Sequence, residues 1–293
     1  MAHLDRHRHQ LPEVPDGWDL LDVRRLGPFV TGARWRRPDG SIFSLSTREH
    51  RKARTALEPS RPSAAAPTAS RVSRWLAVLF CLGSACFVVG PIPAYVSAVG
   101  LTADAVTYFI GSIFFTSAGT LQWLEAANVR RTAGTPVLDH GPRSAVALEP
   151  RRMDWWAALI QLVGTIAFNV TTFAAVRAVP GLRAEELRVW APDAVGSICF
   201  LLSSLLAFVE AQSGAPRAER DRAQRLGWRI AVLNLVGSVL FGLSAVGAYV
   251  VPDTGTLANA TLANAGTFGG GVCFFVAAAL LPRESKAAAA SVG

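Results

Sequence analysis

Three glutamates each follow a glycine by fourteen residues. The pairs are Gly111 and Glu125, Gly196 and Glu210, and Gly270 and Glu284. Carboxylates gathered at one level form the acidic rings of cation pores. Fourteen helical residues rise about 21 Å, so each glutamate is expected near the inner end of a membrane span. Two interpretations remain open: an acidic ring at the inner mouth of a pore, and span-ending charges that pair with Arg130, Arg217 or Arg283.

Side-chain amides inside apolar segments are the second group of candidates. They are Gln161, Asn169 and Asn234, and the first and last of these each lie three residues before a glycine. Polar groups within a membrane face the interior of a helix bundle or a cavity. These amides therefore either bond neighbouring helices together or line a path for a polar solute, and both interpretations remain open.

Signatures of enzymes and metal sites are missing from the sequence. It contains no GxSxG, HExxH, GxxxxGK[ST] or βαβ-type GxGxxG motif. The four cysteines lie in apolar segments without a CxxC pattern, which argues against zinc. No ionisable residue stands at the middle of an apolar segment, which argues against a proton-coupled pump. We expect no catalytic residues, no cofactor and no metal.

Six long apolar segments would position these candidates. A helix needs about 20 apolar residues to cross a bilayer core of about 30 Å. Segments of this length without strict alternation cannot be barrel strands, and a helix satisfies its own backbone in lipid. The sequence therefore predicts an all-α membrane protein with six transmembrane helices, at 75–96, 105–124, 155–176, 193–211, 229–251 and 264–282.

The six spans are predicted to be three repeated helical hairpins, at 75–128, 155–212 and 228–284. Matching stretches recur in the second helices at Gly111-Ser-Ile-Phe-Phe, Gly196-Ser-Ile-Cys-Phe and Gly270-Gly-Val-Cys-Phe. The first helices match at Gly83-Ser-Ala-Cys-Phe, Gly164-Thr-Ile-Ala-Phe and Gly237-Ser-Val-Leu-Phe. Small residues let helix backbones approach closely, so these glycines are interpreted first as packing positions. The third copy replaces serine by Gly271 and is the most divergent.

The distribution of basic residues predicts the orientation. Segments on the side of the termini carry 25 Arg and Lys, whereas the opposite loops carry 3. Positive loops stay in the cytoplasm, so both termini are expected there, in the cell membrane. Six of the eight tryptophans fall at predicted span ends, as in an aromatic belt.

A polar, basic N-terminal module precedes the membrane domain. Residues 1–56 form this module, 57–73 a Pro/Ala/Ser linker, 74–284 the membrane domain and 285–293 a tail. Pro38-Asp39-Gly40-Ser41 is typical of a tight turn and predicts a β-hairpin over about 32–45. The net charge of +8 is explained by contact with anionic lipid rather than with nucleic acid.

The Gly-Ser-Ile-x-Phe core of the second helices resembles the YrhK-like domain, a family of small uncharacterised bacterial membrane proteins. The resemblance is clearest over about 105–128 and 193–212. It implies no established activity and no catalytic residues. The layout is also similar to uncharacterised multi-pass proteins of actinobacteria.

These features favour a non-enzymatic membrane protein that acts as a scaffold, a sensor or an assembly partner. Its basic N-terminus would bind anionic lipid or a cytoplasmic protein. The alternative is a transporter or channel for a small solute or cation, built from three parallel hairpins with sites at their interfaces.

Overall fold

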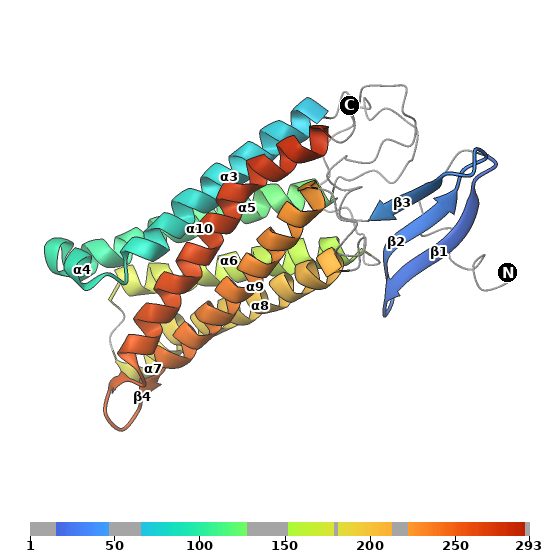
Figure 1. Cartoon of the computed structure of the whole chain (residues 1–293). Coiled ribbons are helices and arrows are strands. Elements are labelled where there is room, and N and C mark those ends of the chain that lie inside the picture. Colours follow the sequence, from blue (N-terminus) through green and yellow to red (C-terminus); the bar gives the residue numbers. More distant parts are fainter. Residues whose placement is uncertain (1–15, 47–65, 128–151, 179–180, 213–221, 291–293) are drawn as a thin grey trace.

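Six long helices form the body of the protein. The structure is a computed structural model that describes residues 16–46, 66–127, 152–178, 181–212 and 222–290. The six helices are long and apolar enough to cross a membrane, as the sequence predicts, and the chain is a multi-pass membrane protein. They are α3 (Ala66–Val89), α5 (Leu101–Ala127), α6 (Met153–Val176), α8 (Ala191–Gln212), α9 (Arg222–Gly247) and α10 (Ala260–Ala290) (Figure 1).

The first and last helices differ from their predicted bounds. Helix α3 begins at Ala66, within the stretch 57–73 that the sequence assigns to a linker, and it ends at Val89 rather than at residue 96. Prolines at 91 and 93 account for the early end, because proline lacks a backbone N–H and disfavours helix in the residue before it. Helix α10 passes through Pro282, so the predicted tail at 285–293 is helical as far as Ala290.

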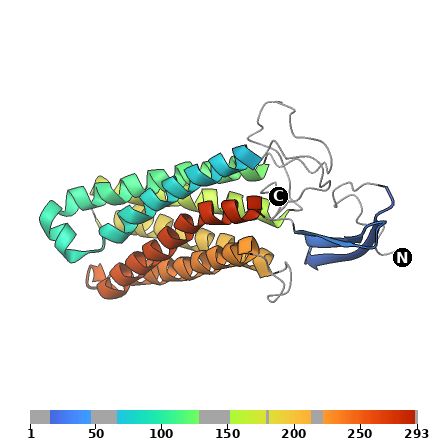
Figure 2. The ribbon, with the colours of Figure 1, turned by 45° about the horizontal axis from the view of Figure 1, so that its top comes forward.

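Each long helix packs mainly against two others, and these contacts close into a ring. Neighbours in sequence pair as α3 with α5, α6 with α8, and α9 with α10. Three further contacts, here called seams, join one pair to the next: the α5/α6 seam, the α8/α9 seam and the α10/α3 seam. Two views 45° apart show the six helices running side by side along one axis (Figures 1 and 2).

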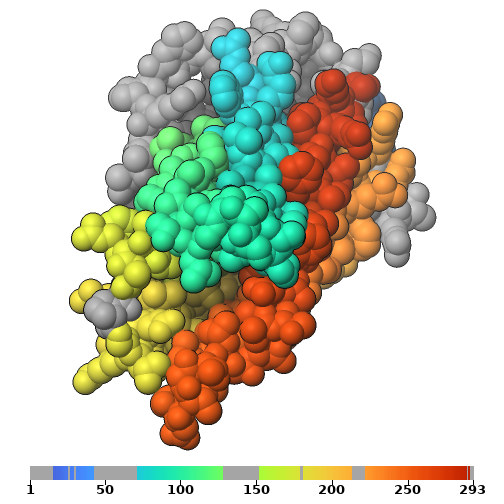
Figure 3. Space-filling model, turned by 90° about the vertical axis from the view of Figure 1, so that its left-hand side faces the viewer, coloured from blue at the N-terminus to red at the C-terminus, as the bar shows by residue number. Residues whose placement is uncertain are grey.

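The two ends of the bundle carry different structures. At the sheet end, α3, α6 and α9 begin, the other three long helices end, and both described chain ends lie nearby (Figure 1). The far end carries α4 (Pro93–Val99), α7 (Leu182–Glu185), the π-helical turn η2 (Glu186–Trp190), β4 (Val250–Val251) and β5 (Thr256–Leu257). Figure 3 views the far end, where atoms of α4 and α5 lie between those of α7–α8 and those of α10.

A three-stranded antiparallel sheet stands beyond the sheet end. Its strands follow the order β1 (Asp19–Leu26), β2 (Phe29–Arg36) and β3 (Ile42–Ser46). Along β2, Thr31, Ala33 and Trp35 are 1–2 % exposed, whereas Arg34 and Arg36 are more exposed, so one face of the sheet is buried. The sequence predicted the β2–β3 hairpin but not β1, whose Asp22 and Arg24 interrupt the apolar alternation.

The predicted turn is present between β2 and β3. A carboxylate oxygen of Asp39 accepts hydrogen bonds from the Ser41 hydroxyl at 2.6 Å and from the Ser41 amide at 2.9 Å. These bonds, the hydroxyl first, hold the pKa of Asp39 below its usual range. Gly40 has a φ of +81°, which only glycine adopts without strain.

Large apolar side chains cover the outside of the bundle. Two residues after the recurring glycines, Ile113, Ile166 and Ile198 are 45–57 % exposed. A soluble protein rarely exposes continuous apolar surface on this scale. The outer surface therefore matches a hydrocarbon environment, while the small residues of the same helices point inward.

Candidate functional site

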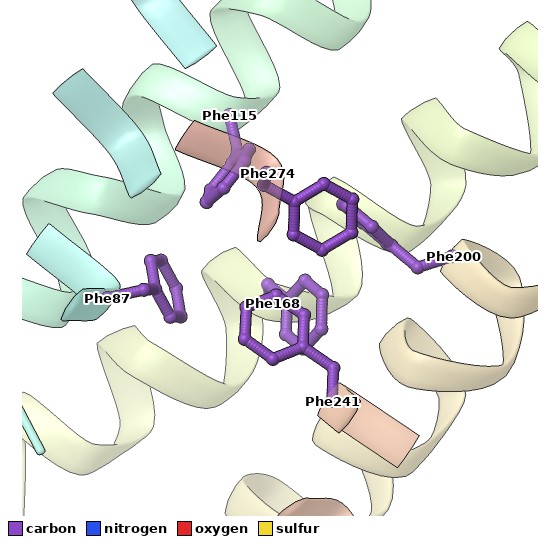
Figure 4. Close-up of a cluster of buried hydrophobic side chains, with 6 residues drawn as sticks. All are labelled: Phe87, Phe115, Phe168, Phe200, Phe241 and Phe274. Carbon is purple, nitrogen blue, oxygen red and sulfur yellow. The ribbon is translucent and has the colours of Figure 1, made fainter. Parts of the chain in front are cut away.

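Six phenylalanines, one from each long helix, fill the centre of the bundle. Each lies four residues after a recurring glycine: Phe87, Phe115, Phe168, Phe200, Phe241 and Phe274. We call them the phenylalanine core. All six are 1–6 % exposed, and their rings point toward one another (Figure 4). The centre of the bundle at this level is therefore occupied by aromatic rings.

Ring contacts link the phenylalanine core in every direction. Within the helix pairs the centroids lie 5.3, 5.1 and 5.3 Å apart. Rings from different pairs also meet, with Phe200 5.6 Å from Phe274 and Phe87 5.8 Å from Phe241. Tilted and edge-on aromatic pairs at this spacing are each worth about 0.5–1.5 kcal/mol beyond their buried area. The core is therefore one connected cluster rather than three separate pairs.

The recurring glycines bring the helices of each pair together at the same level. A Cβ added to Gly83 would lie 3.0 Å from the Gly111 carbonyl oxygen. The same addition at Gly196 would lie 3.2 Å from the Gly164 oxygen, and at Gly270 it would lie 3.0 Å from the Gly237 oxygen. Contacts of this kind are those of packing glycines.

Two of the three predicted amides hold the α5/α6 seam together. Gln161 accepts a hydrogen bond from Gln122 at 3.1 Å and one from Ser203 of α8 at 3.4 Å. Asn169 donates to the Thr116 hydroxyl at 2.6 Å. Nearer the far end, the hydroxyls of Ser112 and Thr172 lie 2.9 Å apart. This polar ladder ties the first helix pair to the second along much of their length.

The third predicted amide is separate from the other two. Asn234 lies on α9 and makes no side-chain hydrogen bond within the described part of the chain. It has the register of Gln161, three residues before a recurring glycine. The serine that bonds Gln161 stands seven residues after Gly196, and the corresponding residue after Gly270 is Ala277, which offers no side-chain partner.

The three predicted glutamates lie at the sheet end in unequal surroundings. Glu210 and Glu284 are 2 % and 0 % exposed and take part in interactions with other groups, whereas Glu125 is half-buried. Arg283 is exposed, and Arg130 and Arg217 lie outside the described residues. Carboxylates around an open mouth would face water, so the burial of two glutamates favours a packing role.

A buried ion pair that the sequence did not single out lies at the start of α6. Arg152 and Asp154 are 6 % and 2 % exposed. The guanidinium donates from Nε to Asp154 at 3.0 Å and from Nη2 to the second carboxylate oxygen. Its Nη1 donates to the Ala126 carbonyl oxygen, near the end of α5, at 2.9 Å. Arg152 precedes Gly164 by twelve residues, and Arg71 and Arg225 precede their glycines equally.

Arg71 and Arg225 are exposed, so the shared spacing does not imply that the three arginines make the same interaction. The twelve-residue spacing between arginine and glycine is the sequence signal that could have identified Arg152 as a candidate. Asp154 follows the buried arginine by two residues, whereas Ser73 and Gly227 stand at the corresponding spacing after Arg71 and Arg225.

A second unpredicted polar group lies toward the far end. The Tyr108 ring packs against Gly90, and a Cβ added to Gly90 would lie 2.4 Å from the ring. Asp104 and Asp193 both lie within electrostatic reach of the Tyr108 hydroxyl. Neither carboxylate forms an ion pair in the described residues.

The described residues contain no group of three or more His, Cys, Asp or Glu side chains placed to hold a metal ion. The chemistry that the site does offer is packing and hydrogen bonding between helices, around an aromatic centre. Comparison of the sequence and fold with known protein families, curated proteins and solved structures gave no match.

Proposed function

We propose that this protein is a non-enzymatic membrane scaffold that carries its N-terminal module on the cytoplasmic face. The phenylalanine core supports the proposal, because six interlocked rings fill the place where a permeation path would run. Hydrophobic closure of this kind excludes water and ions. The bundle then serves to anchor and orient the module rather than to pass a solute.

The proposal includes a threefold architecture and an orientation. The backbone contact between glycines and the phenylalanine four residues later recur in all three helix pairs, which supports three copies of one hairpin. The excess of Arg and Lys on the side of the termini supports a cytoplasmic sheet end. The same Gly-Ser-Ile-x-Phe residues support kinship with the YrhK-like domain.

The charge pattern of the sheet favours a protein partner over lipid alone. Asp22 pairs with Arg34 at 3.3 Å and with Arg24 at 4.0 Å. Strand register places Asp19 opposite Arg36 on the same face. A face with interleaved acidic and basic groups suits a partner that also carries both charges, whereas anionic lipid attracts a uniformly basic surface.

Reconstitution of the full-length protein in liposomes tests the scaffold directly. We expect no flux of K⁺, Na⁺ or small neutral solutes above that of empty liposomes. Flux that is abolished when Phe115 is replaced by Trp, a bulkier ring at the same place, would overturn the proposal. In parallel, cross-linking in cells should capture a cytoplasmic protein, and capture should weaken in the Arg34→Asp variant.

One observation favours the alternative of a transporter or channel. Asn234, Asp104 and Asp193 are polar groups within the membrane helices that lack hydrogen bonds or ion pairs in the described residues. Such groups mark solute pathways in other membrane proteins. If this alternative holds, Asn234→Leu lowers flux in the same liposomes, whereas Asn169→Asp, in the occupied α5/α6 seam, changes stability more than flux.

A further inference from the structure

The sheet contacts the bundle at the helix α6. Strand β2 contacts α6, and no other pairing of a described strand of this sheet with a long helix is as extensive. The buried side chains of β2 include Ala33 and Trp35, and Met153 at the first turn of α6 is 2 % exposed. The sheet therefore contacts the helix that begins beside the Arg152–Asp154 pair.

That ion pair joins two helices as well as two side chains. Arg152 lies at the carbonyl end of α5, where a positive charge is favourable, and Asp154 lies in the first turn of α6, where a negative charge is favourable. The guanidinium donates hydrogen bonds both to Asp154 of α6 and to the Ala126 carbonyl oxygen of α5. Because both groups are buried, separation of either one from the other leaves an unpaired charge away from water.

The polar ladder of the α5/α6 seam begins close to the Arg152–Asp154 pair. Gln122 lies about one turn before Ala126 on α5, and it bonds Gln161, two turns into α6. Between these levels the rings of Trp123 and Trp155 meet at 5.1 Å. A shift at the start of α6 therefore reaches the seam through contacts that are continuous.

We propose that the Arg152–Asp154 pair couples the docking of the sheet to the packing of the α5/α6 seam, so that a partner bound to the sheet alters the order of that seam. The inference rests on the proposed function in one respect, that the sheet receives a partner. The coupling is confined to the α5/α6 seam, since Arg71 and Arg225 are exposed at the same spacing. Coupling of this kind is reciprocal, so the seam equally influences the sheet.

Hydrogen–deuterium exchange of the full-length protein in lipid nanodiscs tests the coupling. Ala33→Arg should lift the sheet from α6, and Asp154→Asn should break the pair without a change in side-chain size. Each variant should speed exchange at 120–127 and 153–165 about tenfold, with α9 and α10 unchanged. The double variant should exchange no faster there than Asp154→Asn alone. The coupling would be overturned if the increases in exchange rate of the two single variants multiply in the double variant, or if Ala33→Arg leaves exchange in the α5/α6 seam unchanged.

A second pair of variants tests whether the Arg152–Asp154 pair influences the sheet. Arg152→Gln should speed exchange of the sheet amides, whereas Arg71→Gln, its exposed counterpart, should leave them at the wild-type rate. Equal rates in both variants would contradict the inference. Neither experiment reads partner capture or solute flux, so the scaffold proposal and the coupling can fail independently.

Discussion

The α5/α6 seam and the α10/α3 seam occupy corresponding places in the ring but are held together differently. In the first, side-chain amides and hydroxyls bond across the helices, as with Asn169 and Thr116. In the second, a Cβ added to Gly271 would lie 3.2 Å from the backbone of Phe87, so the helices meet almost backbone to backbone. Membrane helices associate by close packing or by hydrogen bonds. The α5/α6 seam relies on hydrogen bonds along much of its length, whereas the α10/α3 seam combines the close approach at Gly271 with a hydrogen bond between Ser285 and Ser73 at the sheet end.

The largest expected effect follows from filling the close approach in the α10/α3 seam. Gly271→Leu places a side chain where the backbone of Phe87 and the side chain of Val88 already lie. We expect a loss of about 3 kcal/mol in the free energy of unfolding, from overpacking against backbone atoms. Denaturation by SDS, followed by circular dichroism, measures it.

Gly242→Leu is the matched control for this substitution. Gly242 also lies in a membrane helix, but a Cβ there meets no atom within 4 Å. Leucine at this position should change the free energy of unfolding little. Equal losses in the two variants would contradict close packing in the seam as the cause, because leucine has a higher helix propensity than glycine and this difference alone would stabilise both variants.

An intermediate effect is expected from the polar side of the comparison. Asn169→Leu removes the hydrogen bond to Thr116 and should cost about 1 kcal/mol, a typical value for such bonds in a membrane. Asn234→Leu, at an amide without a side-chain partner in the described residues, should cost nothing or stabilise slightly. Steric trapping of the protein in bicelles measures both, and a larger loss at Asn234 would contradict the contrast.

The smallest expected effect concerns two serines at the same register. The Ser84 hydroxyl is fully buried in α3 and makes no hydrogen bond within the described residues, whereas Ser238 of α9 contacts the Ser204 hydroxyl at 2.7 Å and donates to the Phe200 oxygen at 3.1 Å. Ser84→Ala should therefore be neutral or stabilising, and Ser238→Ala should cost about 1 kcal/mol. Thermal unfolding in one detergent compares them, and an equal loss would mean that Ser84 has a partner in the membrane.

Length and hydropathy were sufficient to predict the six helices, because lipid requires long apolar segments whatever they pack against. The seams could not be predicted, because each depends on which helices become neighbours across the ring. Gln161 and Asn234 share a register, yet only one finds a serine opposite. The Arg152–Asp154 pair could not be predicted for a related reason: in the sequence, charges beside a span look like ordinary span-ending charges, and only the structure shows that they are buried.

The ring also sets an order of events during biosynthesis. Ser285 at the end of α10 donates a hydrogen bond to Ser73 at the start of α3, 212 residues earlier in the chain, at 2.7 Å. Helix α3 therefore completes its contacts only when α10 is in place, and until then the backbone at Phe87 and Val88, where Gly271 packs, lacks that neighbour. A ribosome that stalls before α10 would leave this part of α3 open in the lipid, where membrane chaperones and proteases could distinguish an unfinished chain from a finished one.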